Sequence, residues 1–236
     1  MKHLLSTSIA AIATIALAVP AIATTVIDDF NTGPFTLVDS GDIVAPTFAE
    51  QSGLPGGSVV GGVRLVNARA PGVGTTATAS VGSGSLTLSS DSAFNASFNL
   101  YYDGVADGSA NLIPPGTLGL DLTGESALKL NVSTTGSGAT VQAYLYESFN
   151  PSNPLGQVNA TGQIALTNGA NFISLALFPN LDADDIQTIR LVFRNITQTS
   201  SVTINEFAAV PVPEPGTALL LGGGLAALAA RRRARR

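Results

Sequence analysis

The sequence contains no cysteine and no tryptophan, and His3 is the single histidine among its 236 residues. A serine or cysteine nucleophile is usually activated by a neighbouring histidine, so pairs of this kind are excluded from the rest of the chain. Zinc, copper, haem and iron–sulfur sites built from histidine and cysteine are excluded in the same way. The remaining side chains support carboxylate chemistry and the binding of hard cations through oxygen.

Positive charge is also scarce between the two ends of the chain. The full sequence has 11 Lys and Arg against 16 Asp and Glu, a formal net charge of −5. Without residues 1–23 and 212–236, five cationic residues remain against fifteen acidic ones, a net charge of −10. A body with this charge and no basic patch repels nucleic acid, which we exclude as a partner.

The N-terminus has the pattern of a secretory signal peptide. A weakly positive start precedes the apolar residues 4–19, and Ala21 and Ala23 form an A-x-A cleavage pattern. We predict a signal helix that is removed after Ala23, which leaves Thr24 as the first residue of an exported protein.

The C-terminus has three parts in order: a proline-rich motif, an apolar run and a basic stop. The motif is Val212, Pro213, Glu214 and Pro215, and the stop is Arg231, Arg232, Arg233, Arg235 and Arg236. The apolar run of 14 residues, 217–230, carries no charge. As a helix it reaches about 21 Å, short of the roughly 20 residues that a stable membrane span needs. We expect a short transmembrane helix with its arginines on the cytoplasmic side.

This tripartite tail resembles the PEP-CTERM sorting domain of Gram-negative bacteria, whose signature matches residues 212–215. The resemblance implies export by the secretion machinery and recognition by an exosortase, a membrane-embedded protease or transpeptidase. The protein would be held transiently in the inner membrane through its C-terminal helix. It would then reach the cell surface or extracellular matrix of a bacterium that makes exopolysaccharide. An ordinary short C-terminal anchor is the alternative.

The body between the two targeting segments alternates apolar and polar residues and lacks sustained helical periodicity. Strands are expected over residues 25–30, 59–67, 75–81, 85–88, 95–102, 128–133, 141–146, 163–166, 172–177, 189–194 and 202–207. An Asp-capped helical turn is expected at 182–187. We predict an all-β fold, a single jelly-roll β-sandwich over residues 24–207, followed by a linker at 208–211.

Several segments of the body carry a second resemblance. They are residues 26–30, residues 119–123 before 128–132, and residues 181–193 followed by 203–207. The body is similar in these segments to the galactose-binding-like β-sandwich used by many carbohydrate-binding modules. In that fold the first and last strands commonly lie close together, often beside a structural calcium ion. The resemblance implies Asp28, Asp29 and Glu206 as calcium ligands, whereas solvated residues on strand ends are the alternative.

Tyrosines are the aromatic side chains best suited to bind a sugar here, because tryptophan is absent. Tyr144 and Tyr146 lie opposite Val141, Ala143 and Leu145 on a regular strand, so they could form a carbohydrate-binding surface. In the alternative interpretation, the two tyrosines only cover the second side of a sheet.

We therefore predict a non-enzymatic protein with a structural or adhesive role in an exopolysaccharide layer or biofilm. The second hypothesis is a carbohydrate-binding module. The third is a glycan hydrolase, which needs two carboxyl groups about 5–9.5 Å apart; Glu50, Glu125 and Glu147 are acidic but lie in unrelated local settings.

Overall fold

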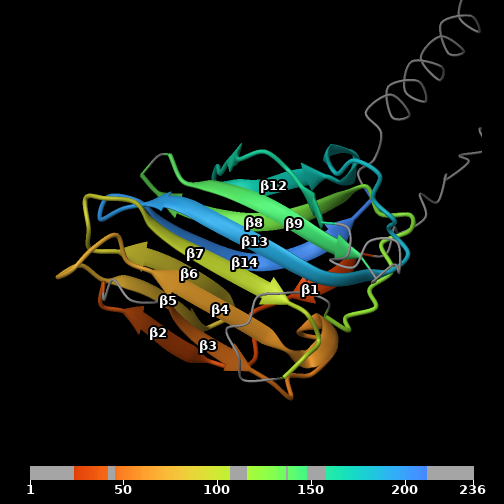
Figure 1. Ribbon diagram of the computed structural model, residues 1–236, viewed down its shortest axis with the longest axis horizontal. Helices are drawn as coiled ribbons and strands as arrows, with labels where there is room; N and C mark the ends of the chain where they lie inside the picture. The colour runs from red at the N-terminus through yellow and green to blue at the C-terminus, as the bar shows by residue number, and fades with distance from the viewer. Residues whose placement is uncertain (1–23, 42–45, 107–115, 137, 148–157, 212–236) are drawn as a thin grey trace, which may run out of the picture.

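Period-two alternation places the apolar side chains of each strand on one side, and two such sheets bury them against each other. The computed structural model describes residues 24–41, 46–106, 116–136, 138–147 and 158–211 as an all-β sandwich of two seven-stranded sheets (Figure 1). Sheet A contains β1 (Thr25–Asp28), β2 (Phe35–Asp39), β5 (Ala77–Gly82), β6 (Ser85–Ser90), β8 (Ala127–Thr135), β12 (Gly169–Ser174) and β14 (Ser201–Val210). Sheet B contains β3 (Thr47–Gln51), β4 (Arg64–Arg69), β7 (Ala96–Tyr102), β9 (Thr140–Glu147), β10 (Val158–Ala160), β11 (Ile164–Ala165) and β13 (Ile186–Ile196).

The chain passes repeatedly from one sheet to the other, so neighbours within a sheet are often distant in sequence. Sheet A has the order β12-β8-β14-β6-β5-β2, and sheet B has the order β10-β9-β13-β7-β4-β3. β1 pairs with β14, and β11 pairs with β9. Two 3-10 turns, η1 (Val60–Gly62) and η2 (Leu175–Leu177), complete the regular structure of the described residues. Figure 1 looks onto sheet B, with sheet A behind it.

The core lies between the two sheets. Phe98 of β7, Phe193 of β13 and Phe207 of β14 are fully buried there. The next residue along the strand, such as Asn99 after Phe98 or Arg194 after Phe193, points to the outer side, as the alternation predicts. This inward and outward division creates the outer face of sheet B, where the candidate binding residues gather.

The structure differs from the sequence prediction at the end of the domain. The segment expected to be a linker, residues 208–211, is largely the end of β14, which runs to Val210 between β1 and β8. Alternation is lost there because Ala127, Ala208 and Val210 form a small buried cluster on the second side of the sheet. The pattern of a half-buried strand therefore does not apply to this segment.

The helical turn predicted at residues 182–187 is also wrong, because this segment is a turn that leads into β13 at Ile186. The backbone groups of this segment form hydrogen bonds with other segments instead of the bonds of a helical turn. Leu122 donates its N–H to the carbonyl of Ala183 at 2.7 Å, and Leu120 and Ile186 form an antiparallel bridge. The Asp182 N–H donates to the Glu147 carboxylate at 2.8 Å.

The predicted signal helix and C-terminal helix lie outside the described residues. Within the described residues, no helix is long and apolar enough to cross a membrane.

Candidate functional site

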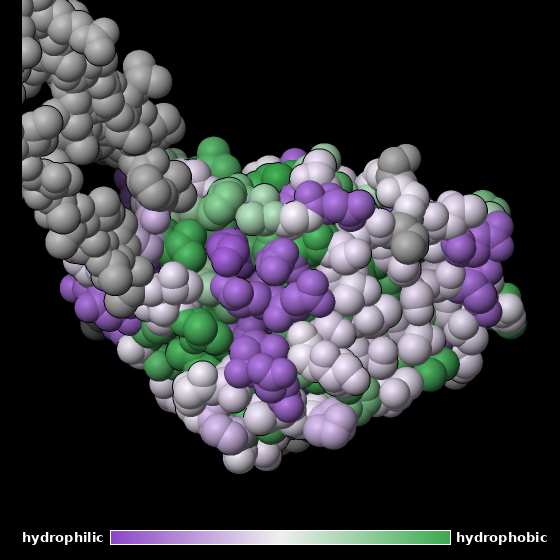
Figure 2. Space-filling view, turned by 180° about the vertical axis from the view of Figure 1, so that it is seen from behind, coloured by the Kyte–Doolittle hydropathy of each residue, from purple (hydrophilic) through white to green (hydrophobic). Residues whose placement is uncertain are grey.

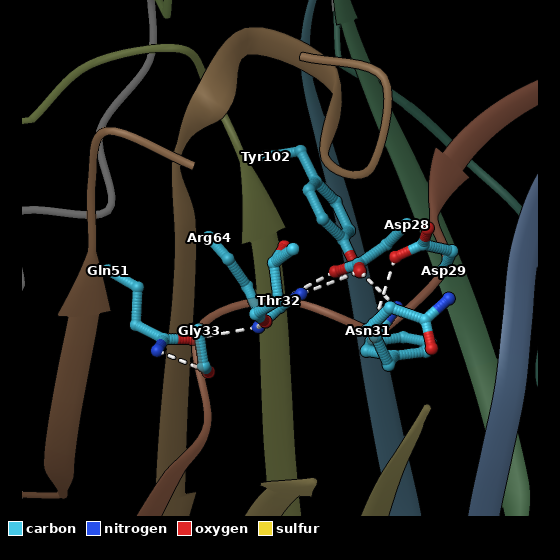
Figure 3. A network of polar contacts seen from close by, with 9 residues as sticks. Asp28, Asp29, Asn31, Thr32, Gly33, Gln51, Arg64 and Tyr102 are labelled. Carbon is cyan, nitrogen blue, oxygen red and sulfur yellow. Dashed lines mark hydrogen bonds and ion pairs between the residues drawn. The ribbon is translucent and has the colours of Figure 1, made fainter. Parts of the chain in front are cut away.

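A buried ion pair joins the two sheets at one end of the sandwich (Figure 3). Asp28 ends β1 in sheet A and Arg64 begins β4 in sheet B, and both side chains are fully buried. Arg64 Nε donates to Asp28 Oδ2 at 2.5 Å and Arg64 Nη2 donates to Asp28 Oδ1 at 2.6 Å. This two-point geometry matches the flat guanidinium to the flat carboxylate.

Four further groups contact this ion pair, one of them the Thr32 carbonyl, which accepts from Arg64 Nη1 at 3.3 Å. The Tyr102 hydroxyl donates to Asp28 Oδ2 at 2.8 Å, and the Phe30 N–H donates to Asp28 Oδ1 at 2.8 Å. Arg64 Nη1 donates to Gln51 Oε1 at 2.8 Å. The network therefore connects β1 with β3, β4 and β7, and it satisfies charges that would be costly to bury alone.

Burial and hydrogen bonding have opposite effects on the pKa of Asp28. Burial raises the pKa of Asp28, while its hydrogen bonds from Arg64, Phe30 and Tyr102 oppose that rise. Burial raises the pKa of the Tyr102 hydroxyl well above its ordinary value, and the adjacent Asp28 raises it further. Tyr102 is therefore a neutral donor, and it stabilises the carboxylate.

The three carboxylates named as possible calcium ligands, Asp28, Asp29 and Glu206, each contact a different group in the structure. β1 and β14 do pair, with Asp28 opposite Phe207. However, Arg64 already engages both oxygens of Asp28. Glu206 accepts from Lys129 Nζ at 3.1 Å on the outer side of sheet A, and Asp29 accepts the Asn31 N–H at 2.9 Å.

The three carboxylates are therefore engaged separately. Among the described residues, no group of three or more His, Cys, Asp or Glu side chains is placed to hold a metal ion.

The outer face of sheet B carries a row of aromatic and cationic side chains. In the strand register, Arg190 of β13 lies between Tyr101 of β7 and Tyr144 of β9. Its guanidinium lies 5.2 Å from the centre of the Tyr101 ring and 5.0 Å from that of the Tyr144 ring. Both distances are in the range of cation–π contacts.

A second row, composed of amides, lies next to the first. Asn67 of β4 lies opposite Asn99 of β7. On the other side of Asn99 the register continues with Val192 of β13 and then Gln142 of β9. Arg190 Nη2 donates to Asn99 Oδ1 at 2.8 Å, and Asn99 Nδ2 donates to Asn67 Oδ1 at 3.3 Å. These hydrogen bonds join β4, β7 and β13, and the contact of Arg190 with the Tyr144 ring extends the platform to β9.

Two donors in this platform have no hydrogen-bond partner among the residues that the structure describes. They are Asn67 Nδ2 and the Tyr101 hydroxyl, on residues that are only 2% and 4% exposed. Burial raises the pKa of Tyr101, so its hydroxyl keeps its proton and can donate. A buried polar group without a partner is costly, and such groups often mark a place that a ligand or water completes.

Of the predicted sugar contacts, Tyr144 lies in this platform, half-buried beside Arg190. Tyr146 lies on the same outer side of β9 but is almost fully buried. Sequence reasoning missed Tyr101, Arg190, Asn99 and Asn67. Their position in the alternation indicated that they face outward, but strand order, which brings them together, has no signal in one sequence.

The opposite face of the sandwich has a different character. Seen from behind, over sheet A, hydrophilic residues gather in the middle and hydrophobic patches flank them (Figure 2). Lys129 and Glu206 form the ion pair of this face, and Phe172 on β12 is 53% exposed. No aromatic ring stacks on a cation on this face among the described residues.

The C-terminal segment matches a known sorting signal. Residues 211–233 match the PEP-CTERM protein-sorting motif, which confirms the resemblance seen at residues 212–215. The motif indicates an exported protein that an exosortase handles at the membrane. Residues 212–236 lie outside the described ranges, so the motif and the basic stop are known here from sequence alone.

Solved carbohydrate-binding modules resemble the body at low identity. The family 11 module of Clostridium thermocellum, in complex with a β-1,3-1,4-mixed-linked tetrasaccharide, is 12% identical with a TM-score of 0.41, covering 82% of this chain and 99% of that chain. A family 11 module in solution is 12% identical with a TM-score of 0.46, covering 83% and 99%. A family 29 module is 9% identical with a TM-score of 0.34, covering 74% and 98%. No match to a curated protein was found. At these values the likeness assigns no ligand to this chain.

Proposed function

We propose that this protein is exported, is processed by an exosortase, and binds a glycan with the outer face of sheet B. The observation that carries the glycan proposal is the platform formed by Tyr101, Tyr144, Arg190, Asn99 and Asn67. Sugars present hydroxyl groups and flat apolar ring faces, and this platform offers planar amide and guanidinium groups beside aromatic rings.

The proposed role is adhesive rather than catalytic. We propose that the sandwich belongs to the galactose-binding-like jelly-roll class and acts at the cell surface or in a matrix of exopolysaccharide. Support comes from the absence of histidine and cysteine from the body, together with the sorting motif. Glu147, one of the acids considered for hydrolysis, accepts the Asp182 N–H, and Glu125 accepts from Thr25 at 3.1 Å.

Glycan binding is tested with the protein purified from the producing cells. We expect signals on a glycan array that Arg190→Ala reduces at least about tenfold, because this substitution removes the cation between the two rings and the bonds to Asn99. Tyr144→Ala is expected to weaken the same signals. The control is Phe172→Ala, which removes an exposed aromatic side chain from sheet A and leaves binding intact. An array with no signal for the parent protein would reject glycan binding.

Sorting is tested in the cell by deleting residues 212–236. We expect the parent protein to be recovered at the surface or in the matrix with an intact mass that lacks both residues 1–23 and part of the tail. The deleted form is expected to lose this location, because the sorting segment is gone. As a control, Arg190→Ala leaves the tail intact and should be sorted normally. Unchanged localisation of the deleted form would contradict exosortase-dependent sorting.

A further inference from the structure

Positive charge in the body is concentrated on one face. The body has five cationic residues: Arg64, Arg69, Lys129, Arg190 and Arg194. Arg64 is buried against Asp28, and Lys129 pairs with Glu206 on the outer side of sheet A. The remaining three arginines all lie on the outer face of sheet B, and none of them has a carboxylate ion-pair partner among the described residues.

The strand register spreads these arginines around the platform. Arg69 lies opposite Ser97 of β7, and Arg194 lies opposite Thr140 of β9, so both belong to the row beyond the amides. With strands about 4.8 Å apart, Arg69 and Arg194 stand on β4 and β13 roughly 10 Å from each other at the backbone. Arg190 precedes Arg194 by four residues, about 13 Å along β13. This separation corresponds to a ligand of several sugar units.

The exposed cationic groups on this face are hydrogen-bond donors. Arg69 and Arg194 are exposed, and guanidinium groups donate without accepting. Donors of this kind are complementary to a ligand that is rich in negatively charged acceptors.

Acidic side chains are few on the same sheet. The strands of sheet B contain only two, Glu50 on the edge strand β3 and Glu147 at the end of β9. Glu50 lies opposite Leu65, at the edge of the Tyr101 row. The body as a whole has a net charge of −10, so this face is a local exception to the charge that surrounds it.

From these observations we infer that the outer face of sheet B binds an anionic glycan, one whose sugar units carry carboxylates. Arg69 and Arg194 pair with carboxylates at one end of the bound segment. Arg190 and the amide row hold the sugar units that follow toward the other end. This inference rests on the proposed glycan binding and specifies the chemical class of the ligand. Charge-assisted hydrogen bonds from arginine to carboxylate supply the preference for acidic over neutral chains.

The test compares polygalacturonate with the same polymer after its carboxyl groups are reduced to alcohols. We expect the protein purified from the producing cells to bind the acidic polymer at least about tenfold more tightly. Arg69→Gln and Arg194→Gln are each expected to weaken that binding about fivefold and to leave binding of the reduced polymer unchanged. Raising the salt from 50 to 500 mM should weaken only the acidic complex, because exposed charges are screened.

Lys129→Gln is the matched control, because it removes the same charge from the opposite face and should change neither affinity. Melting temperatures of the three variants establish that each is folded, and Arg69→Lys should recover part of the affinity if Arg69→Gln loses it. Equal binding of both polymers would overturn the anionic ligand and leave glycan binding standing. An equal loss with Lys129→Gln would also overturn it, because net charge rather than this face would then explain the effect. Absence of binding to either polymer, together with an array without signal, would reject both proposals.

Discussion

Arg64→Ala is expected to lower the free energy of unfolding by about 3–5 kcal/mol, the range found when one partner of a buried ion pair is removed. The substitution leaves Asp28 fully buried with its charge uncompensated and takes a donor from Gln51. It also removes the guanidinium that lies 5.3 Å from the centre of the Phe30 ring. Urea unfolding followed by circular dichroism measures the loss.

Two comparisons make this expectation specific. Lys129→Ala removes a half-exposed ion pair with Glu206, and the free energy of unfolding should fall by less than about 1 kcal/mol. Arg64→Ala combined with Asp28→Ala should cost less than the sum of the single substitutions, because neither charge is then left alone. Single losses that simply add, or an Arg64→Ala loss no larger than that of Lys129→Ala, would contradict a central role for this pair.

The pH dependence of the Arg64→Ala variant follows from Asp28. Burial raises the pKa of Asp28, and the substitution removes the Arg64 hydrogen bonds that oppose this rise. A raised pKa in the folded state means that the folded protein holds the proton more tightly than the unfolded chain. The deficit of the variant relative to the parent is therefore largest near neutral pH and shrinks as the pH falls through that raised value. A deficit independent of pH would contradict this explanation.

Gly136→Ala is the second substitution expected to have a large effect. Gly136 has a φ of +82°, and a Cβ atom there would lie 2.1 Å from the carbonyl oxygen of Thr199. A left-handed backbone costs a residue with a side chain about 1–2 kcal/mol, and the forced movement of a backbone carbonyl adds roughly 1–3 kcal/mol. We expect a total loss of about 2–5 kcal/mol in the free energy of unfolding.

Gly138→Ala separates these two contributions. Gly138 also has a positive φ, +101°, but a Cβ atom there would meet nothing within 4 Å. Its substitution should carry the backbone cost alone, so the difference between the two alanine variants measures the close approach to the turn at Thr199. Equal losses in the two variants would show that the Thr199 carbonyl moves away from the new Cβ atom at little cost.

The fold class could be predicted because it depends on a local signal. Strands predicted at residues 128–133 and 141–146 correspond to β8 and β9, where polar and apolar residues alternate cleanly. β2 and β3 were missed. β3 packs no fully buried residue, and both are edge strands of five residues. Short edge strands need bury only part of one side, so their pattern is weak.

The candidate site was predictable only in part, because it depends on pairing between distant segments. Tyr144 was identified from its own strand, whereas Arg190 lies 46 positions later in the numbering and becomes its neighbour only through the β9–β13 register. The Asp28–Arg64 pair has the same origin, since 36 residues separate its members. A charged residue in an apolar strand, as Arg64 is at the start of β4, was the available sign that a buried partner exists.

β14 has a mechanical consequence for the proposal that the protein is sorted through its C-terminal segment. The strand ends at Val210, just before the segment matched by the sorting motif, and it is hydrogen-bonded to β8 along its length and to β6 and β1 on its other side. Tension applied beyond Pro211 would act along the strand and across its ladder bonds, which run perpendicular to it. Many bonds would then bear the load together in shear, instead of opening one after another as they do when an edge strand is peeled away. A molecule attached through this segment would therefore resist pulling.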